Sequence, residues 1–300
     1  MQINMIRSDK VYQEMLELPL EKREGCFRAK ILSPFATKYQ TQHIPLKAKY
    51  PGGFDALFLL GFMNQLPSTL SEKDRPAIDA LSSDQLWQNC QDTIKRSIGL
   101  FEQAGYDLVV EDYHFTILLG NPEKPMLQLN KGYSGDGGIP GYLMLSLLPN
   151  DYTLPRVQAA LAHECNHNVR FQFIKWNQQT TLADWVVSEG LAESFAAELY
   201  GEDLIGPWVT STSSEQLEEI KPIISSQLQL TGMAEMAPYL YGDEIAKIQG
   251  QIPVGMPYAA GYAYGYHLIQ AYLKKTGKNI IEATVTPTEE ILEATKDFWK

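Results

Sequence analysis

Cysteine is scarce in this chain of 300 residues. The three cysteines, Cys26, Cys90 and Cys165, lie far apart and form no CxxC pair. A disulfide framework, or a structural zinc site built on thiolates, needs more cysteines at closer spacing. We therefore expect reduced thiols, and we expect any metal ion to be held by histidine and carboxylate side chains.

Long apolar runs and clusters of basic residues are also missing. The longest apolar stretch, Ala56 to Met63, is far shorter than the roughly 20 residues that cross a bilayer, and the first residues carry no signal-peptide core. The formal net charge is −11, and no run of Lys or Arg offers a surface for nucleic acid or anionic lipid. These features predict a cytoplasmic protein whose partners are neither nucleic acids nor membranes.

What the chain does contain is a composition typical of a globular protein, with 44% hydrophobic and 20% charged residues. In its first third, apolar residues recur at helical spacing. They predict a short helix around residues 12–18, a buried helix from Phe54 to Leu66 and a longer helix from Ser83 to Ala104. We expect a helical N-terminal lobe over residues 1–105 and a catalytic region over residues 106–300. The lobe either supports the catalytic region or forms one wall of a substrate cleft.

From Tyr106 onward the pattern changes to β-branched and aromatic residues. It predicts strands within residues 106–119, 126–129 and 142–148. Together with the helices, these strands indicate an α+β fold that is mainly helical, with a small mixed sheet whose edge strand flanks a metal-binding helix.

A glycine-rich segment, Gly135 to Gly141, leads into the last predicted strand. Missing side chains allow a close backbone approach, and Pro140 is tolerated mainly at the edge of a sheet. An edge strand can pair with an extended peptide through its free N–H and C=O groups. The alternative is that these glycines only form a turn.

The most informative motif is His163-Glu164-Cys165-Asn166-His167, an HExxH within a helix predicted over residues 154–176. Side chains four residues apart lie on one helix face, so His163 and His167 can bind one ion with Glu164 beside them as a general base. Catalytic zinc usually has three protein ligands and a water molecule. The motif is therefore one ligand short.

A second helix is predicted from Leu182 to Tyr200, ending at Gly201, and it carries Glu189 and Glu193 one turn apart. A carboxylate pair among apolar residues calls for a cation. We predict that Glu189 is the third ligand and that Glu193 accepts the free ring N–H of a ligating histidine. The alternative is a solvated acidic face.

The region after Gly201 has the weakest pattern. Residues 214–230 suggest a helix broken at Pro222, residues 232–255 suggest a surface excursion, and a last helix is predicted over residues 256–275.

These motifs resemble a known group of enzymes. HExxH followed by a helical glutamate is similar to the gluzincins, a zincin-like group of zinc metallopeptidases, and SEGLAE at residues 188–193 is similar to their NEGxA-type string. More narrowly, residues 105–275 resemble the YjaZ-like predicted zinc-dependent proteases. The resemblance implies a Zn²⁺ cofactor and a peptide or protein substrate, with His163, His167 and Glu189 as ligands.

The resemblance also points to a tyrosine that stabilises the oxyanion. Tyr258 fits the Pro-Tyr-x-x-Gly pattern of gluzincin aminopeptidases, whereas Tyr262 lies in the Gly-Tyr string typical of the YjaZ-like proteins. A phenol aimed at the developing oxyanion would stabilise the tetrahedral intermediate. Tyr262 is slightly favoured; the alternative is that these tyrosines serve only packing.

One departure bears on the substrate. Gluzincin aminopeptidases hold the free amine of the substrate with a glutamate in the glycine-rich strand, but residues 138–146 contain no acidic side chain. An endopeptidase is therefore favoured, although Asp136 just before this segment could replace that glutamate. Two other functions stay open: a non-catalytic, zinc-stabilised binding or regulatory protein, and a zinc hydrolase of a non-peptide amide or ester.

Overall fold

The structure is a computed structural model that describes residues 1–299. These residues are mainly helical and contain one small mixed sheet, which confirms the predicted α+β class. The chain groups into two units: residues 1–96 with 109–161, and residues 97–108 with 162–300. This grouping does not test the predicted roles of residues 1–105 and 106–300, which stay predictions. No helix among the described residues is long and apolar enough to cross a membrane.

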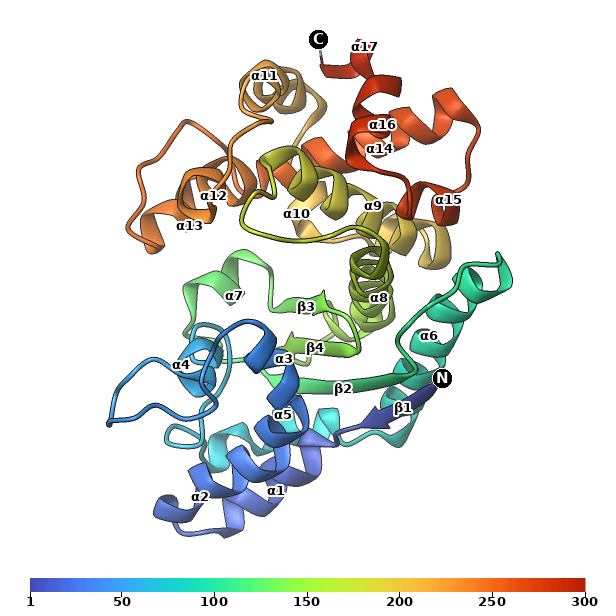
Figure 1. Cartoon of the computed structure of the whole chain (residues 1–300). Coiled ribbons are helices and arrows are strands. Elements are labelled where there is room, and N and C mark those ends of the chain that lie inside the picture. The colour runs from blue at the N-terminus through green and yellow to red at the C-terminus, as the bar shows by residue number, and fades with distance from the viewer. Residues whose placement is uncertain (300) are drawn as a thin grey trace. The chain divides into compact units, whose positions relative to one another are not determined.

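The first unit contains the sheet, whose strands lie in the order β1-β2-β4-β3 (Figure 1). The parallel pairs are β1 with β2 and β2 with β4, while β3 runs antiparallel to β4. The bounds of the strands are β1 Gln2–Met5, β2 Asp112–Leu119, β3 Tyr133–Ile139 and β4 Tyr142–Leu147. Two of the predicted strands, β2 and β4, are therefore confirmed.

The sheet also corrects three predictions. Residues 126–129 lie in a helix, α7 (Pro125–Leu129), because Pro125 occupies its first turn, where no N–H is needed. The glycine-rich segment is itself the edge strand β3, and β4, which we expected at the edge, is paired on both sides. Gly141, at φ 90°, allows the tight connection between β3 and β4.

The helices of the first unit agree less well with the sequence predictions than the strands β2 and β4 do. The expected buried helix from Phe54 to Leu66 is only the short α4 (Ala56–Leu60). Phe54, Phe58 and Phe62 share one face at helical spacing, but that face is about half exposed, at 53%, 50% and 48%. The other helices of this part are α1 (Ser8–Glu17), α2 (Leu20–Phe27), α3 (Ala36–Thr41) and α5 (Arg75–Leu81).

Two helices contribute residues to both units. They are α6 (Asp84–Gln103) and α8 (Val157–Phe173). The remaining helices of the second unit are α9 (Leu182–Tyr200), α10 (Pro207–Thr210), α11 (Ser214–Ser225), α12 (Met233–Tyr241), α13 (Asp243–Ile248), α14 (Ala260–Thr276), α15 (Ile280–Thr284), α16 (Thr288–Ala294) and α17 (Lys296–Trp299). The predicted break at Pro222 is wrong, since α11 continues through it, and the expected surface excursion contains α12 and α13.

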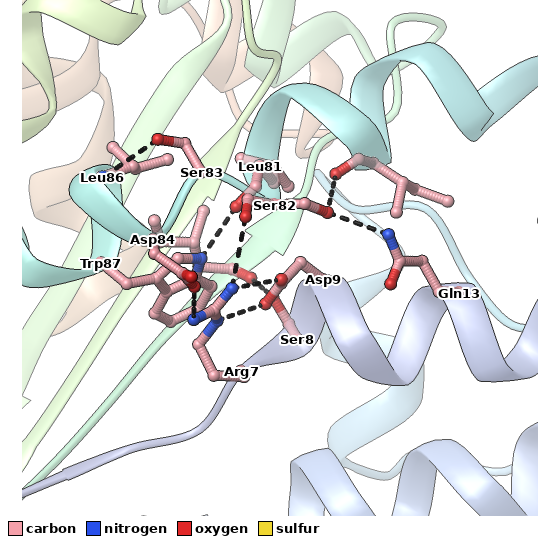
Figure 2. A network of polar contacts seen from close by, with 12 residues as sticks. Arg7, Ser8, Asp9, Gln13, Leu81, Ser82, Ser83, Asp84, Leu86 and Trp87 are labelled. Atoms are coloured by element: carbon pink, nitrogen blue, oxygen red, sulfur yellow. Dashed lines mark hydrogen bonds and ion pairs between the residues drawn. The ribbon is translucent and has the colours of Figure 1, made fainter.

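A polar network fastens the N-terminus of the first unit (Figure 2). The guanidinium of Arg7 donates to both carboxylate oxygens of Asp9, at 2.8 and 2.7 Å, and to Asp84 at 2.6 Å. It also lies 5.1 Å from the centre of the Trp87 ring. Asp9 is 1% exposed, whereas the side chain of Asp84 is 90% exposed, so the two carboxylates contribute differently to stability.

We predict that Asp9→Asn lowers the free energy of unfolding by about 2 kcal/mol, because it leaves the partly buried Arg7 without its bidentate partner. The matched change Asp84→Asn removes an exposed partner and should cost no more than about 1 kcal/mol. Urea unfolding followed by circular dichroism measures both. Equal losses would contradict the assigned difference.

Candidate metal centre

Three buried side chains of the second unit point their ligand atoms at one another. His163 Nε2 lies 3.2 Å from Glu189 Oε2 and 3.1 Å from His167 Nε2, and His167 Nε2 lies 3.3 Å from Glu189 Oε2. All three residues are 4–7% exposed. The structure thus brings together the three residues that the motif spacing selected, two from α8 and one from α9.

The donor set fits a zinc ion. Three ligands bound tetrahedrally at 2.0–2.2 Å lie about 3.4 Å apart, close to the observed separations of 3.1–3.3 Å. Two ring nitrogens and a carboxylate oxygen cannot all hydrogen-bond one another around such a triangle, because a proton serves only one edge. A cation at the centre would satisfy all three at once.

Local sequence explains why α9 presents Glu189 here. Its first turn is held by a capping box, in which Thr181 accepts from the N–H of Asp184 and Asp184 accepts from the N–H of Thr181. It ends at Gly201, whose φ of 93° favours glycine, so both predicted ends are confirmed. Every residue from Val186 to Ala196 is buried. The alternative of a solvated acidic face does not describe Glu189 and Glu193, which are 5% and 2% exposed.

The carboxylate of Glu193 is held by three donors. His163 Nδ1 lies 2.7 Å from Glu193 Oε2, the indole Nε1 of Trp208 donates to the same oxygen at 2.8 Å, and the backbone N–H of Gly206 donates to Oε1. Glu193 therefore fixes the ring of His163 and directs its Nε2 at Glu189. Sequence reasoning missed Trp208 and Gly206, because neither has a spacing relation to the motif.

The charges of the group are strongly coupled. Burial alone would lower the pKa of His163, but hydrogen bonds to Glu189 and Glu193 outweigh it and hold that pKa well above its ordinary value. Burial would likewise raise the pKa of Glu189, but His167 and His163 lower it to about 2. Without a metal ion, the proton on His163 therefore stabilises the buried carboxylates of Glu189 and Glu193.

A buried arginine ties the two metal-site helices together. Arg170, one turn after His167 and 0% exposed, donates to Ser188 Oγ at 3.1 Å, directly before Glu189. It also donates to the carbonyl oxygens of Thr284 at 2.7 Å and Thr286 at 3.0 Å. Burial lowers its pKa to about 10, so it still carries its charge at neutral pH. Arg170 thereby joins α8 and α9 with the end of α15 and the turn that follows it.

Helix α14 meets α9 through glycine. A Cβ on Gly190 would lie 2.1 Å from the carbonyl oxygen of Gly265, and a Cβ on Gly265 would lie 2.0 Å from that of Val186. Only glycine allows this backbone contact, which sets α14 against the turn of α9 that carries Glu189. Tyr262, in the first turn of α14, is consequently close enough to feel the charges of Glu189 and Glu164.

The other predicted residues are placed as follows. Glu164 is 7% exposed and lies on α8 next to His163. Burial, and then the negative charge of Glu189, raise the pKa of Tyr262 well above its usual value. Tyr258 precedes α14 and lies within electrostatic reach of Tyr262. The structure therefore gathers the predicted residues on α8, α9 and the start of α14.

These features define a candidate metal centre of the HExxH type, with a helical glutamate as third donor. A family model described as "Predicted Zn-dependent protease (DUF2268)" matches residues 86–293. The chain belongs to this family, which confirms the narrower resemblance, to the YjaZ-like predicted zinc-dependent proteases.

Two curated relatives from Bacillus subtilis (strain 168) are similar to the chain. It is 34% identical to "Uncharacterized protein YjfC" over 293 residues, which cover 97% of each sequence. It is 26% identical to "Uncharacterized protein YjaZ" over 155 residues, or 50% of this chain and 55% of the relative. No solved structure gives a significant match.

We predict that Gly190→Ala lowers the free energy of unfolding by about 3 kcal/mol, because the methyl group forces α9 away from α14. Gly99→Ala on α6 is the control, since its nearest neighbour is Gln103 Nε2 at 3.8 Å, and it should stabilise by about 0.5 kcal/mol. Thermal and urea unfolding compare the two. A Gly190→Ala variant as stable as the control would refute the close contact.

We also predict that zinc binding releases about one proton at neutral pH, because the raised pKa of His163 keeps it protonated in the metal-free protein and zinc needs the free nitrogen. Affinity should therefore increase with pH until this proton is lost. Titration calorimetry with zinc in buffers of different ionisation enthalpy counts the protons. Glu193→Gln, which removes one cause of the raised pKa, should release fewer. Binding without proton release would contradict the assigned charge state.

Proposed function

We propose that the protein is a zinc-dependent peptidase, and more narrowly an endopeptidase, with Zn²⁺ held by His163, His167 and Glu189. The observation that carries this proposal is the convergence of their three ligand atoms within 3.1–3.3 Å. When bound, zinc would lower the pKa of a water molecule to about 7 and polarise the carbonyl group of the substrate.

The residues of this chain have distinct parts in the proposed reaction. Glu164 accepts a proton from the attacking water and passes it to the leaving nitrogen of the peptide bond. Tyr262 donates a hydrogen bond to the oxyanion of the tetrahedral intermediate, and Tyr258 is the alternative donor. Glu193 accepts from His163 Nδ1 and keeps the opposite ring nitrogen available as a ligand.

Catalysis is favoured over a purely structural metal site. Among residues 1–299, the grouped metal-binding side chains are His163, His167 and Glu189, so the proposed site has three protein ligands. Structural zinc sites are normally closed by four. A base at Glu164 beside a three-ligand site is useful for hydrolysis, whereas a binding or regulatory protein would not need it.

The choice of an endopeptidase rests on Asp136 in the edge strand β3. Its carboxylate lies 2.7 Å from the ammonium of Lys38, whose side chain is 2% exposed. A carboxylate already neutralised by a buried lysine is a poor anchor for the free amine of a substrate. We propose instead that β3, an edge strand of the sheet, binds an extended substrate through its backbone.

Aromatic side chains beside His167 suggest the kind of residue that the site accepts. Phe171 stacks on the His167 ring at 5.6 Å, Trp176 lies 4.6 Å from Phe171, and Trp185 lies 4.7 Å from Trp176. These three side chains are each partly exposed. We propose that they favour apolar substrate side chains.

The test combines metal analysis with peptide cleavage. Elemental analysis should find about one zinc per chain in the wild type, and His163→Ala and Glu189→Ala should lose it. Zinc-loaded protein is then incubated with labelled casein and with a library of internally quenched peptides blocked at both ends. Cleavage of blocked peptides supports an endopeptidase, whereas cleavage of unblocked peptides or of model esters alone would favour an exopeptidase or a non-peptide hydrolase.

We predict that Glu164→Gln retains zinc but lowers the rate of peptide cleavage by about 10³-fold, because the general base is lost. Glu198→Gln, at an exposed position of α9, is the matched control and should retain both zinc and activity. Metal content and initial rates are measured on the same samples. A zinc-loaded Glu164→Gln protein with wild-type activity would remove Glu164 from the mechanism.

A further inference from the structure

Residues 206–208, at the start of α10, supply two donors to the carboxylate of Glu193. The indole Nε1 of Trp208 donates to Glu193 Oε2 at 2.8 Å, and the backbone N–H of Gly206 donates to Oε1. Backbone and indole N–H groups can only donate, so the atoms themselves fix the direction of both bonds. Each carboxylate oxygen of Glu193 is therefore held by a donor of its own.

The local sequence explains how Trp208 reaches this position. Pro207 occupies the first position of α10, where a missing N–H costs no hydrogen bond. A Cβ on Gly206 would lie 2.0 Å from Cε2 of Trp208, so the indole ring lies over the backbone of Gly206. The φ of Gly206 is −70°, which any residue can adopt, so glycine is needed here for space. Gly206 and Trp208 thus form one unit whose indole N–H is directed at Glu193.

The oxygen that Trp208 holds also orients a proposed metal ligand. His163 Nδ1 lies 2.7 Å from the same Oε2 of Glu193. The rings of His163 and Trp208 meet edge to face, with their centres 5.9 Å apart and their planes at 71°. Because Oε2 is shared, a movement of this oxygen would also move the hydrogen bond that orients His163.

The opposite nitrogen of the same ring belongs to the metal site. His163 Nε2 lies 3.2 Å from Glu189 Oε2 and 3.1 Å from His167 Nε2. A rotation of the His163 ring would therefore change the spacing of the three ligand atoms. Removing a side chain that orients a metal ligand typically weakens metal binding by about 10–100-fold.

We propose that Trp208 is a positioning residue for the metal centre. By donating to Glu193 Oε2, its indole fixes the carboxylate that holds His163 Nδ1, and this directs His163 Nε2 toward Glu189 and His167. Trp208 itself binds neither metal nor substrate, and it acts only through Glu193 and His163. This inference rests on the proposed function and adds to it a residue that lies outside the two sequence motifs.

The test compares Trp208→Phe, which keeps an aromatic ring but removes the donor, with Trp87→Phe. Trp87 is a matched control in the first unit: it is 3% exposed, and its Nε1 also donates at 2.8 Å, to the carbonyl oxygen of Leu81. Competition with a chromophoric chelator measures zinc affinity in the full-length protein. We expect Trp208→Phe to weaken zinc binding by about 10-fold and Trp87→Phe to leave it unchanged. Thermal midpoints of the metal-free variants are measured in parallel, because a purely structural role would lower stability and leave zinc affinity unchanged.

A double variant tests whether Trp208 acts through Glu193. Glu193→Ala removes the acceptor of the indole, so adding Trp208→Phe to it should weaken zinc binding no further. If Trp208→Phe weakens binding as much in the Glu193→Ala background as in the wild type, Trp208 does not act through Glu193 and the positioning role is wrong.

A further measurement needs neither activity nor Glu193→Ala. In metal-free protein labelled with ¹⁵N-tryptophan, the indole resonance of Trp208 is assigned by its loss in Trp208→Phe. It should shift in the isosteric Glu193→Gln variant, because a bond to a carboxylate is stronger than one to a neutral amide. It should shift again when zinc is added to the wild type, whereas the Trp87 resonance should stay unchanged in both experiments. A Trp208 resonance that responds to neither change would overturn the inference.

The outcomes separate this inference from the proposed function. If the wild type binds zinc but cleaves no peptide, the peptidase function fails, and the zinc affinities still decide the role of Trp208. If the wild type binds zinc and Trp208→Phe binds it as tightly, the positioning role is wrong, whatever the peptidase activity. If the wild type binds no zinc, both proposals are wrong.

Discussion

The burial of two carboxylates in one apolar helix is the constraint on which the second unit depends. Glu189 and Glu193 are 5% and 2% exposed, and an unpaired charge at that depth is costly. The neighbouring elements supply what these carboxylates need. Imidazole groups come from α8, and the indole of Trp208 and the N–H of Gly206 come from the segment after Gly201. For the same reason, a cation between the converging ligand atoms of His163, His167 and Glu189 would stabilise the buried carboxylate.

Precision at this site comes from backbone contacts that only glycine permits. Gly190 follows Glu189 directly, and its contact with Gly265 fixes α14 on α9. Gly242 and Gly261 repeat the device where α12 meets the start of α14. If flexible side chains formed these helix contacts instead, the positions of Tyr241 and Tyr262 would be less precisely fixed. The guanidinium of Arg170, in contrast, holds Ser188, next to Glu189, by a hydrogen bond.

Predictions of the fold succeeded where local signals defined an element and failed where those signals were ambiguous or where pairing and packing decided. The helix from Leu182 to Tyr200 was predicted at both ends, because its capping box and terminal glycine are local signals. Residues 126–129 were wrongly predicted as a strand, since four apolar residues do not distinguish a strand from a helical turn. Strand β3 was missed because glycine has a low strand propensity, and pairing with β4 outweighed it. Periodicity predicted a buried helix from Phe54 to Leu66, but Phe54, Phe58 and Phe62 are about half exposed. A periodic pattern shows that apolar residues share a face, and it does not show whether another element covers that face.

The sequence by itself determined the helical spacing of His163 with His167 and of Glu189 with Glu193, because the geometry of an α-helix fixes which side chains share a face. The sequence also determined the family, because the HExxH motif and the SEGLAE string follow each other within the matched residues 86–293. Only the tertiary structure decided that Glu193 is held by Trp208, that Arg170 joins three segments and that Tyr241 lies beside Tyr262. These contacts join residues that are 15 to 116 positions apart, so no local period encodes them. They follow instead from how the helices pack, and close packing depends on all the neighbouring side chains at once.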